Sequence, residues 1–285
     1  MGKSVAVLAV HGMGSQGAKR PAYTSIPTFS KDLKRLVTAE INRTKKSRFQ
    51  NNVAWREVFW ADILQDRQNN YFNRINSRTR GIRLRRFLVK NISDAAAYRQ
   101  DHNANTYQKI HQRIDEALKD FDNDKEVDKE GRLIILAHSL GGHIMSNYLY
   151  DLQKTGSTRL GTFYSTKTTM AFVTFGCNIP LFTFAYNPAD VMPIRRPGTT
   201  LKDTKYYLTN WWQNFYDKDD VLGYPLGEIS PGYEALKNKG ELSDKSINAG
   251  GFLTSWNLLS HNAYWKDADF YRPVARLIDK AIDPA

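Results

Sequence analysis

The chain of 285 residues contains a single cysteine, Cys177, so no intramolecular disulfide can form. An unpaired thiol favours a reducing compartment, and we expect a cytoplasmic protein. No apolar run approaches the roughly 20 residues that a membrane-spanning helix needs. A cleaved signal peptide is not expected, because the strand predicted at Val5–Val10 begins almost at the first residue and would be lost on cleavage. These features point to a globular protein outside the secretory route.

Short motifs for metal ions and phosphates are also missing from the sequence. It has no H-x-x-x-H pair, no compact His/Asp/Glu cluster and no G-x-x-x-x-G-K-[ST] loop. We therefore expect neither a metal nor a cofactor. Cys177 follows a predicted strand, and we expect it to be a small buried residue rather than a nucleophile.

Acidic residues are absent from residues 67–93, which are rich in arginine, and the whole chain carries a net charge of +12. A run of like charge is most often a solvated face. Contact with an anionic membrane surface, an acidic partner or nucleic acid is the alternative, and of these nucleic acid is the least expected. The surrounding segment 64–97 is irregular, basic and aromatic, so we expect it to form a cap or lid within a single domain spanning residues 1–285.

Strand patterns alternate with helical patterns through the rest of the chain. Apolar runs predict strands at Val5–Val10, Val53–Trp60, Arg132–Ala137 and Thr169–Phe175, and within Lys205–Tyr216. Apolar residues at helical spacing predict helices at Ser30–Ile41 and Tyr107–Phe121, after Ser139, and at Arg272–Ile282. This alternation predicts an α/β fold with a mostly parallel sheet covered by helices on both faces. Such sheets carry functional groups at the carboxyl ends of their strands.

Ser139 lies where the strongest predicted strand turns into a helix, within RLIILAHSLGGHIMSNYL. Gly141 and Gly142 give room for the helix to pack back against the strand. A turn of this kind lifts a serine hydroxyl above the sheet, and the helix N-terminus adds positive potential where an oxyanion would form. The motif is G-x-S-x-G with Ala137 in place of the first glycine, a residue still small enough for close packing.

The chain here resembles the α/β-hydrolase superfamily, particularly its compact serine lipases and esterases. The residues that carry the resemblance are Ala137-His138-Ser139-Leu140-Gly141-Gly142 and, upstream, His11-Gly12-Met13-Gly14. The resemblance is weakest over residues 64–97. It implies an α/β-hydrolase fold with a serine nucleophile.

A nucleophilic serine needs a base, and that base needs a group to orient it, in the order serine, acid, histidine on this fold. His143 and His261 are the histidines that follow Ser139, and His143 precedes every candidate acid, so His261 is expected to be the base.

The acid is expected to follow a strand, which favours the cluster after Lys205–Tyr216. Within it Asp220 borders the apolar residue Val221, whereas Asp217 and Asp219 flank a lysine. In similar lipases the acid also precedes a hydrophobic residue, with a proline a few residues on, and this match falls on Asp220. Asp217 and Asp219 remain alternatives, as does Asp190, while Asp244 is expected in a polar loop without a strand.

The stretch VAVLAVHGMGSQG, residues 5–17, admits two interpretations. Its glycines have the G-x-G-x-x-G spacing of a dinucleotide site, but Pro21 and Pro27 interrupt the helix that such a site requires, and Asp62 is misplaced for the ribose. The alternative is an oxyanion loop, in which the backbone N–H groups of Met13 and Leu140 face the reacting carbonyl, as similar lipases imply for Met13. His11 is expected to brace this loop.

These residues together predict a carboxylic ester hydrolase, an esterase or lipase acting on a small-molecule ester through an acyl-enzyme. Ser139 attacks, His261 transfers protons and Asp220 orients His261. A thioesterase or acyltransferase with the same triad is an alternative. A further alternative is a non-enzymatic basic protein that binds an anionic membrane or nucleic acid.

Overall fold

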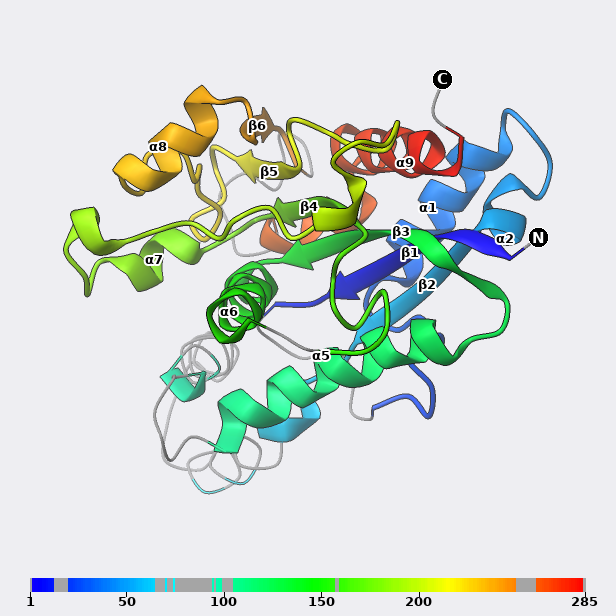
Figure 1. Ribbon diagram of the computed structural model, residues 1–285. Coiled ribbons are helices and arrows are strands. Elements are labelled where there is room, and N and C mark those ends of the chain that lie inside the picture. Colours follow the sequence, from blue (N-terminus) through cyan, green and yellow to red (C-terminus); the bar gives the residue numbers. More distant parts are fainter. Residues whose placement is uncertain are drawn as a thin grey trace.

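A computed structural model of the chain contains one six-stranded sheet with helices packed on both faces (Figure 1). The structure describes residues 2–12, 20–64, 105–156, 159–249 and 260–283, together with residues 70, 74, 94 and 96–98. The strands are β1 (Lys3–Val10), β2 (Val53–Val58), β3 (Val127–His138), β4 (Thr169–Phe175), β5 (Trp212–Asp217) and β6 (Leu242–Ile247). Every neighbouring pair of these strands is parallel. The predicted α/β architecture, a parallel sheet flanked by helices, is confirmed.

The central strands are buried on both faces, which explains their continuous apolar sequences. In β1, Val5, Val7 and Ala9 belong to one hydrophobic cluster, and the alternate residues of the strand belong to the other. This division follows from the period of two along a strand. β1 therefore separates the two halves of the core.

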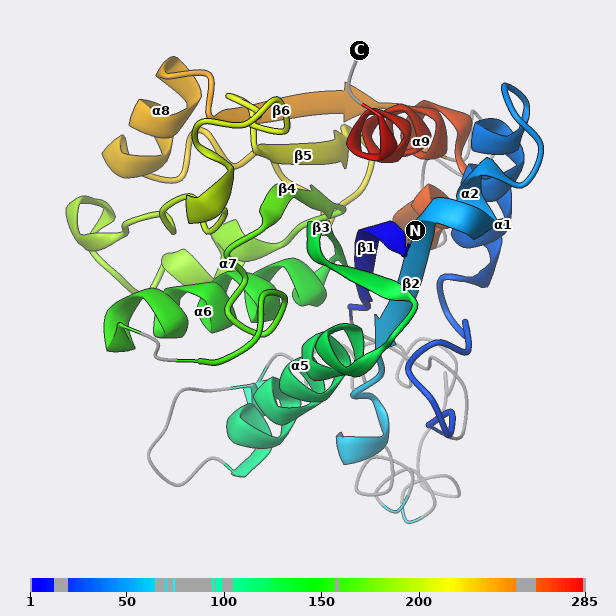
Figure 2. The same ribbon diagram turned by 45° about the vertical axis from the view of Figure 1, so that its right-hand side comes forward.

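The helices are α1 (Lys31–Asn42), α2 (Arg48–Asn52), α5 (Asn105–Asn123), α6 (Leu140–Thr155), α7 (Ile179–Thr183), α8 (Pro231–Asn238) and α9 (Ala268–Ile282). Short 3₁₀ helices form at η1 (Pro188–Asp190), η2 (Thr199–Leu201) and η3 (Ser260–Lys266). Buried residues of α1 and α9 pack on one face of the sheet, and those of α5 and α6 pack on the other (Figure 2). The four helices predicted from apolar spacing are α1, α5, α6 and α9.

The edge strand β6 was not expected from its sequence, LSDKSI, which is mostly polar. It pairs with β5 in register Asn214↔Asp244, so the expectation that Asp244 lies in a loop is wrong. The Asp244 carboxylate accepts hydrogen bonds from the N–H groups of Leu226 and Gly227 and from the side chain of Asn214. The polar residue Asp244 therefore has a structural role. β6 pairs with only one strand, and polar side chains on such an edge strand remain accessible to solvent.

A short apolar arm, residues 179–192, follows β4 and projects from the body of the molecule at the left of Figure 1. It begins with α7 and exposes Leu181, Phe184, Tyr186 and Met192. Phe182 anchors the arm, because its ring stacks on that of His143 in the first turn of α6 at a centroid distance of 4.1 Å.

The segment expected to be a cap or lid, 64–97, lies almost entirely outside the described residues, as does the basic stretch 67–93. Leu64 at its start and Asp94 near its end are described, and both are buried. Among the helices that the structure describes, none combines the length and apolar character needed to cross a bilayer.

Candidate active site

The strand order of the sheet reverses between β1 and β3, since β2 lies on one side of β1 and all later strands lie on the other. Open α/β sheets bind ligands outside the carboxyl ends of their strands at such a reversal. His11 and Gly12 directly follow β1, and Ser139 directly follows β3. The two motifs singled out in the sequence thus meet at this point of the sheet.

Ser139 adopts a backbone conformation that non-glycine residues rarely use, with φ 54° and ψ −127°. Its N–H donates to the carbonyl of Phe175 at the end of β4, with an N···O distance of 3.0 Å. A Cβ added to Gly141 would lie 2.6 Å from the carbonyl oxygen of His11, so α6 can approach β1 only with glycine at that position. Strain of this kind persists where the surrounding structure enforces it, and it is common at reactive residues.

Side chains from three separate parts of the chain form a hydrogen-bonded line at this turn. The Ser139 hydroxyl lies 2.7 Å from Nε2 of His261, and Nδ1 of His261 lies 2.9 Å from Oδ2 of Asp220. A carboxylate can only accept, so Nδ1 carries the proton and Nε2 accepts from the serine hydroxyl. All three residues are buried. This geometry is the one that nucleophilic catalysis requires, in which a hydroxyl contacts an imidazole and a carboxylate orients that imidazole.

The alternative carboxylates have other positions. Asp217 is buried, but its oxygens accept from the N–H groups of Asp219 and Ala249, which ties β5 to the segment after β6. Asp219 and Asp190 are exposed. Of the carboxylates weighed from the sequence, Asp220 is the one that the structure brings to His261.

Asp220 is also held by two groups that the sequence analysis did not single out. The N–H of Leu222 donates to Oδ1 at 3.0 Å, and the Tyr264 hydroxyl donates to Oδ2 at 2.9 Å. Burial acts to raise the pKa of Asp220. The hydrogen bond and the charge of His261, together with the hydrogen bonds from Leu222 and Tyr264, outweigh burial and lower the pKa. Tyr264 follows His261 by three residues. Had the 3₁₀ helix η3 been predicted, this spacing would have placed Tyr264 on the same side of the helix as His261.

For the expected oxyanion donors, Leu140 is the first residue of α6, and Met13 lies outside the described residues. The first N–H groups of a helix have no acceptor within the helix, so the Leu140 N–H belongs to a set that can face an anion. Gly12, which precedes Met13, packs directly on Ser139: an added Cβ would lie 2.4 Å from Cβ of Ser139. The loop after β1 therefore begins in contact with Ser139.

His11 fixes the start of that loop through both ring nitrogens. Nδ1 donates to the carbonyl of Gly12 at 2.6 Å, and the N–H of Trp60 donates to Nε2 at 3.2 Å. Trp60 also stacks on the ring and donates from its indole to the His11 carbonyl. Burial lowers the pKa of His11 to about 3, partly offset by the bond to Gly12, so the ring is neutral. These contacts fit a bracing role and leave neither nitrogen available as a base.

Cys177 and His143, the remaining candidates, lie beside the turn without joining the line. Cys177 is buried with its sulfur against Gly142, and burial raises the pKa of its thiol to about 12. His143 accepts from the side chain of Asn147 and stacks on Phe182, as described above. No set of three His, Cys, Asp or Glu side chains suited to a metal ion occurs among the residues that the structure describes.

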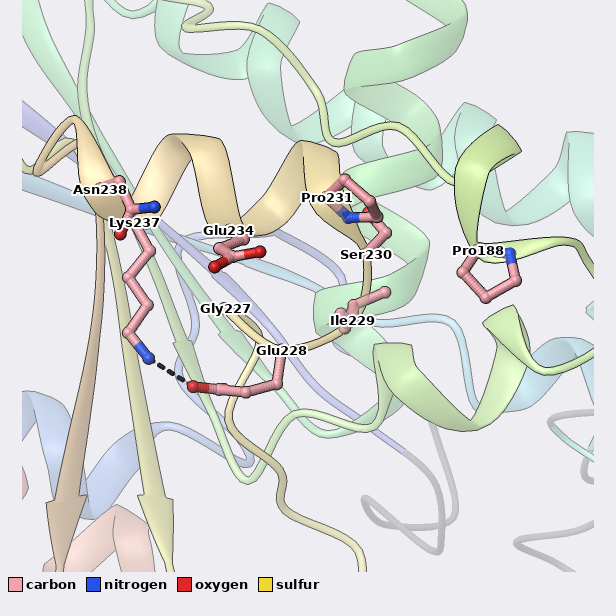
Figure 3. A pocket seen from close by; sticks show the side chains of 9 residues that line it. All are labelled: Pro188, Gly227, Glu228, Ile229, Ser230, Pro231, Glu234, Lys237 and Asn238. Atoms are coloured by element: carbon pink, nitrogen blue, oxygen red, sulfur yellow. Dashed lines mark hydrogen bonds and ion pairs between the residues drawn. The ribbon is translucent and has the colours of Figure 1, made fainter.

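A separate surface groove of about 530 Å³ lies between η1 and α8 (Figure 3). Glu228 and Lys237, which both line it, form an ion pair, and Pro188 and Pro231 also line it. None of the residues that line it takes part in the hydrogen-bonded line at Ser139.

No protein-family model matches the chain, and no curated protein matches it. Among solved structures, it is similar to TT1662 from Thermus thermophilus, with 11% identity, a TM-score of 0.43, and coverage of 100% of this chain and 91% of that one. It is also similar to a bacterial heroin esterase, with 12% identity, a TM-score of 0.34, and coverage of 99% and 76%.

Proposed function

We propose that this protein is a serine hydrolase that cleaves carboxylic esters through an acyl-enzyme. The observation that supports the proposal is the continuous hydrogen-bonded line from the Ser139 hydroxyl through His261 to Asp220. Nε2 of His261 lies 2.7 Å from the Ser139 hydroxyl, and Nδ1 lies 2.9 Å from Oδ2 of Asp220. Its position at the reversal of the strand order, on a strained turn before α6, adds to that support.

In the first half of the reaction, Ser139 Oγ attacks the ester carbonyl and His261 Nε2 takes the hydroxyl proton. The tetrahedral intermediate collapses, the bond to the alcohol oxygen breaks, and His261 returns the proton to the leaving alcohol. Water then attacks the acyl-serine by the same route, His261 again taking and returning one proton. Asp220 holds the Nδ1 proton and stabilises the imidazolium without itself becoming protonated. The cycle consumes one ester and one water and needs no cofactor.

Negative charge on the former carbonyl oxygen would be stabilised by the N–H groups of Leu140 and Met13. The Leu140 N–H lies at the positive end of α6, where oriented peptide dipoles favour an anion. His11 and Gly12 hold the backbone immediately before Met13 against Ser139, which limits where the second donor can lie.

Exposed apolar side chains near this site favour an ester with an apolar acyl or alcohol group. Val221 directly follows Asp220 and is 65% exposed, and Phe184 in the arm after β4 is 80% exposed. The arm is linked to the site through Phe182, which stacks on His143 one turn after Ser139. We therefore include contact between this arm and the apolar part of the substrate in the proposal.

The decisive experiment is labelling with a fluorophosphonate, followed by peptide mapping and assays on nitrophenyl esters of increasing acyl length. We expect label on Ser139 alone, ester turnover in the wild-type protein, and loss of both in Ser139→Ala. Label on another residue of an active protein would overturn the assignment of the nucleophile. An active protein that takes no label would overturn the serine mechanism.

The same preparation distinguishes the alternative acyl-transfer activities. Esters and thioesters are compared as donors, and water is compared with added alcohols as the acceptor. Faster turnover of thioesters, or acyl alcohols as the main product, would replace ester hydrolysis by thioester hydrolysis or acyl transfer on the same line of residues.

A further inference from the structure

Two side chains of η3 contact the same carboxylate oxygen. His261 and Tyr264 are three residues apart, and a 3₁₀ helix has three residues per turn, so both project from the same side of η3. Nδ1 of His261 and the hydroxyl of Tyr264 each lie 2.9 Å from Oδ2 of Asp220. One turn of helix thus carries both the proposed base and a second donor to its partner.

The direction of the Tyr264 hydroxyl is fixed by its other neighbour. The N–H of Asp217, at the end of β5, donates to the hydroxyl oxygen at 2.8 Å. The oxygen accepts that bond, so its own proton is directed to Asp220. Tyr264 is fully buried, and burial together with the Asp220 charge raises its pKa far above the usual value, so it remains a donor.

Two glycines allow this arrangement to be close-packed. A Cβ added to Gly223 would lie 2.6 Å from Oδ2 of Asp220 and 3.1 Å from the Tyr264 hydroxyl. One added to Gly176 would lie 3.0 Å from the Tyr264 ring and 3.2 Å from the His261 ring. The backbone therefore encloses the Asp220–Tyr264 contact and leaves little room for either side chain to rotate.

We propose that Tyr264 is a positioning residue for the Ser139–His261–Asp220 line. Its hydroxyl fixes Oδ2 of Asp220 opposite Nδ1 of His261 and shares the charge of the carboxylate. The inference depends on the proposed hydrolase function, but it concerns a different group and has its own test. A buried carboxylate with two oxygens and one histidine partner needs further donors to remain ionised, and Tyr264 supplies one of them.

The hydroxyl also limits how strongly Asp220 attracts a proton on His261. Groups that face His261 are His138 from β3, Asp220 after β5 and Ser139 before α6, and Asp217 faces Tyr264 from β5. His138 is neutral, since burial and the nearby His261 hold its pKa well below the usual range. Removing the Tyr264 proton donor leaves more of the Asp220 charge to the His261 imidazolium that forms in the proposed reaction.

The test is Tyr264→Phe, which removes one oxygen and retains the ring. We expect kcat to fall by about tenfold to a hundredfold, the usual effect of losing a hydrogen bond to a charged group, while KM changes by less than about twofold. The acid limb of kcat/KM against pH should move upward. A purely structural role would lower thermal stability but leave kcat per phosphonate-titrated site and the pH profile unchanged, and that result would overturn the inference.

Tyr233→Phe is the matched control, because Tyr233 is equally buried but lies on α8 and packs on Trp212, away from the line. It should retain the wild-type kcat and pH profile. Gly223→Ala is a second variant, retaining the hydroxyl but crowding it and Asp220, and we expect the same loss of kcat. If Tyr264→Phe does not fold, an unchanged kcat in Gly223→Ala overturns the inference. Absence of phosphonate label on wild-type Ser139 would instead overturn the proposed function.

Discussion

His138 donates a hydrogen bond from Nε2 to the backbone carbonyl of His261, with a distance of 2.7 Å between the two atoms. The residue before the proposed nucleophile thus holds the backbone of the proposed base, although 123 positions separate the two histidines in the chain. Their rings lie 4.7 Å apart. Nδ1 of His138 is buried without a hydrogen-bond partner among the described residues. The bond from Nε2 must therefore offset the cost of burying the whole ring.

Replacing His138 by phenylalanine should therefore release the backbone that carries His261. We expect kcat to fall by about tenfold, because the Ser139–His261 contact loses its support, and the free energy of unfolding to fall by about 1–3 kcal/mol from the unpaired buried carbonyl. His138→Gln reaches the carbonyl with an amide N–H and should retain most of the activity. Equal kcat losses in both variants would show that the ring, rather than the hydrogen bond, matters.

Asp220→Asn should lower kcat by about 10⁴-fold, because the amide favours the wrong tautomer of His261. Asp219→Asn is the matched control: its side chain is exposed one residue away, and activity should be unchanged. Asp217→Asn should lower stability, since its carboxylate accepts from the N–H of Ala249 at 2.6 Å, while kcat per active site stays near wild type. A large kcat loss in Asp217→Asn with little in Asp220→Asn would transfer the role to Asp217.

The arm after β4 should affect turnover of long esters more than short ones. Phe184→Ser removes a large exposed ring, and we expect KM for an octanoate ester to rise by about threefold to tenfold while the acetate ester is unaffected, since burying a few methylene groups contributes about 0.8 kcal/mol each. Leu160→Ser is the control, because Leu160 is 91% exposed but does not belong to the arm. Its neighbour Gly161 instead packs on Asp122, at the end of α5. Equal effects of the two variants on both esters would remove the arm from the proposal.

Most of the sheet could be predicted because its central strands are buried on both faces and read as continuous apolar runs. β4 has the predicted bounds, whereas β5 begins in the second half of its predicted region and ends one residue beyond it, at Asp217. β6 could not be predicted, because an edge strand made of polar residues carries no periodic apolar signal. The short helices α7 and α8 gave no signal long enough to detect.

The residues of the candidate site could be predicted where the proposed chemistry requires a certain order of residue types along the chain. They could not be predicted where only tertiary contacts bring a residue to the site. Elimination among two histidines predicted His261 as the base, and the strand-turn-helix pattern predicted Ser139 as the nucleophile; the structure brings the two into hydrogen-bond contact. Tyr264 and the N–H of Leu222 depend on η3 and on the turn after Asp220, which only the fold brings together. Met13 remains a prediction, because it lies outside the described residues.

The packing of α6 against the segment after β4 should depend on Gly142. An added Cβ would lie 2.6 Å from Sγ of Cys177, so Gly142→Ala should lower the free energy of unfolding by about 1–3 kcal/mol. Cys177→Ala removes that sulfur and should remain active, because the buried thiol takes no part in the proposed reaction. The double variant should cost less than the sum of the two single changes, as expected for residues in contact. Additive costs from urea unfolding would contradict this account.

Acid should destabilise the protein through its buried histidines. Burial lowers the pKa of His143 to about 4, that of His11 to about 3 and, helped by Arg159, that of His111 to about 3, against an ordinary value of about 6.5 in the unfolded chain. Between about pH 6.5 and 4 the unfolded chain therefore binds protons that the folded chain does not. The free energy of unfolding should be constant with respect to these groups above pH 6.5 and fall as the pH is lowered, by up to about 1.4 kcal/mol per pH unit for each histidine.

His143→Phe isolates one of these contributions, because the new ring can still stack on Phe182. Urea unfolding at pH 7.5 gives the packing cost of the change, and unfolding at pH 5 gives that cost combined with the loss of one titrating group. We expect the variant to lose less stability than the wild type between the two pH values, by about 1–2 kcal/mol. An identical loss would mean that His143 is already protonated in the folded protein at pH 5, in spite of its burial.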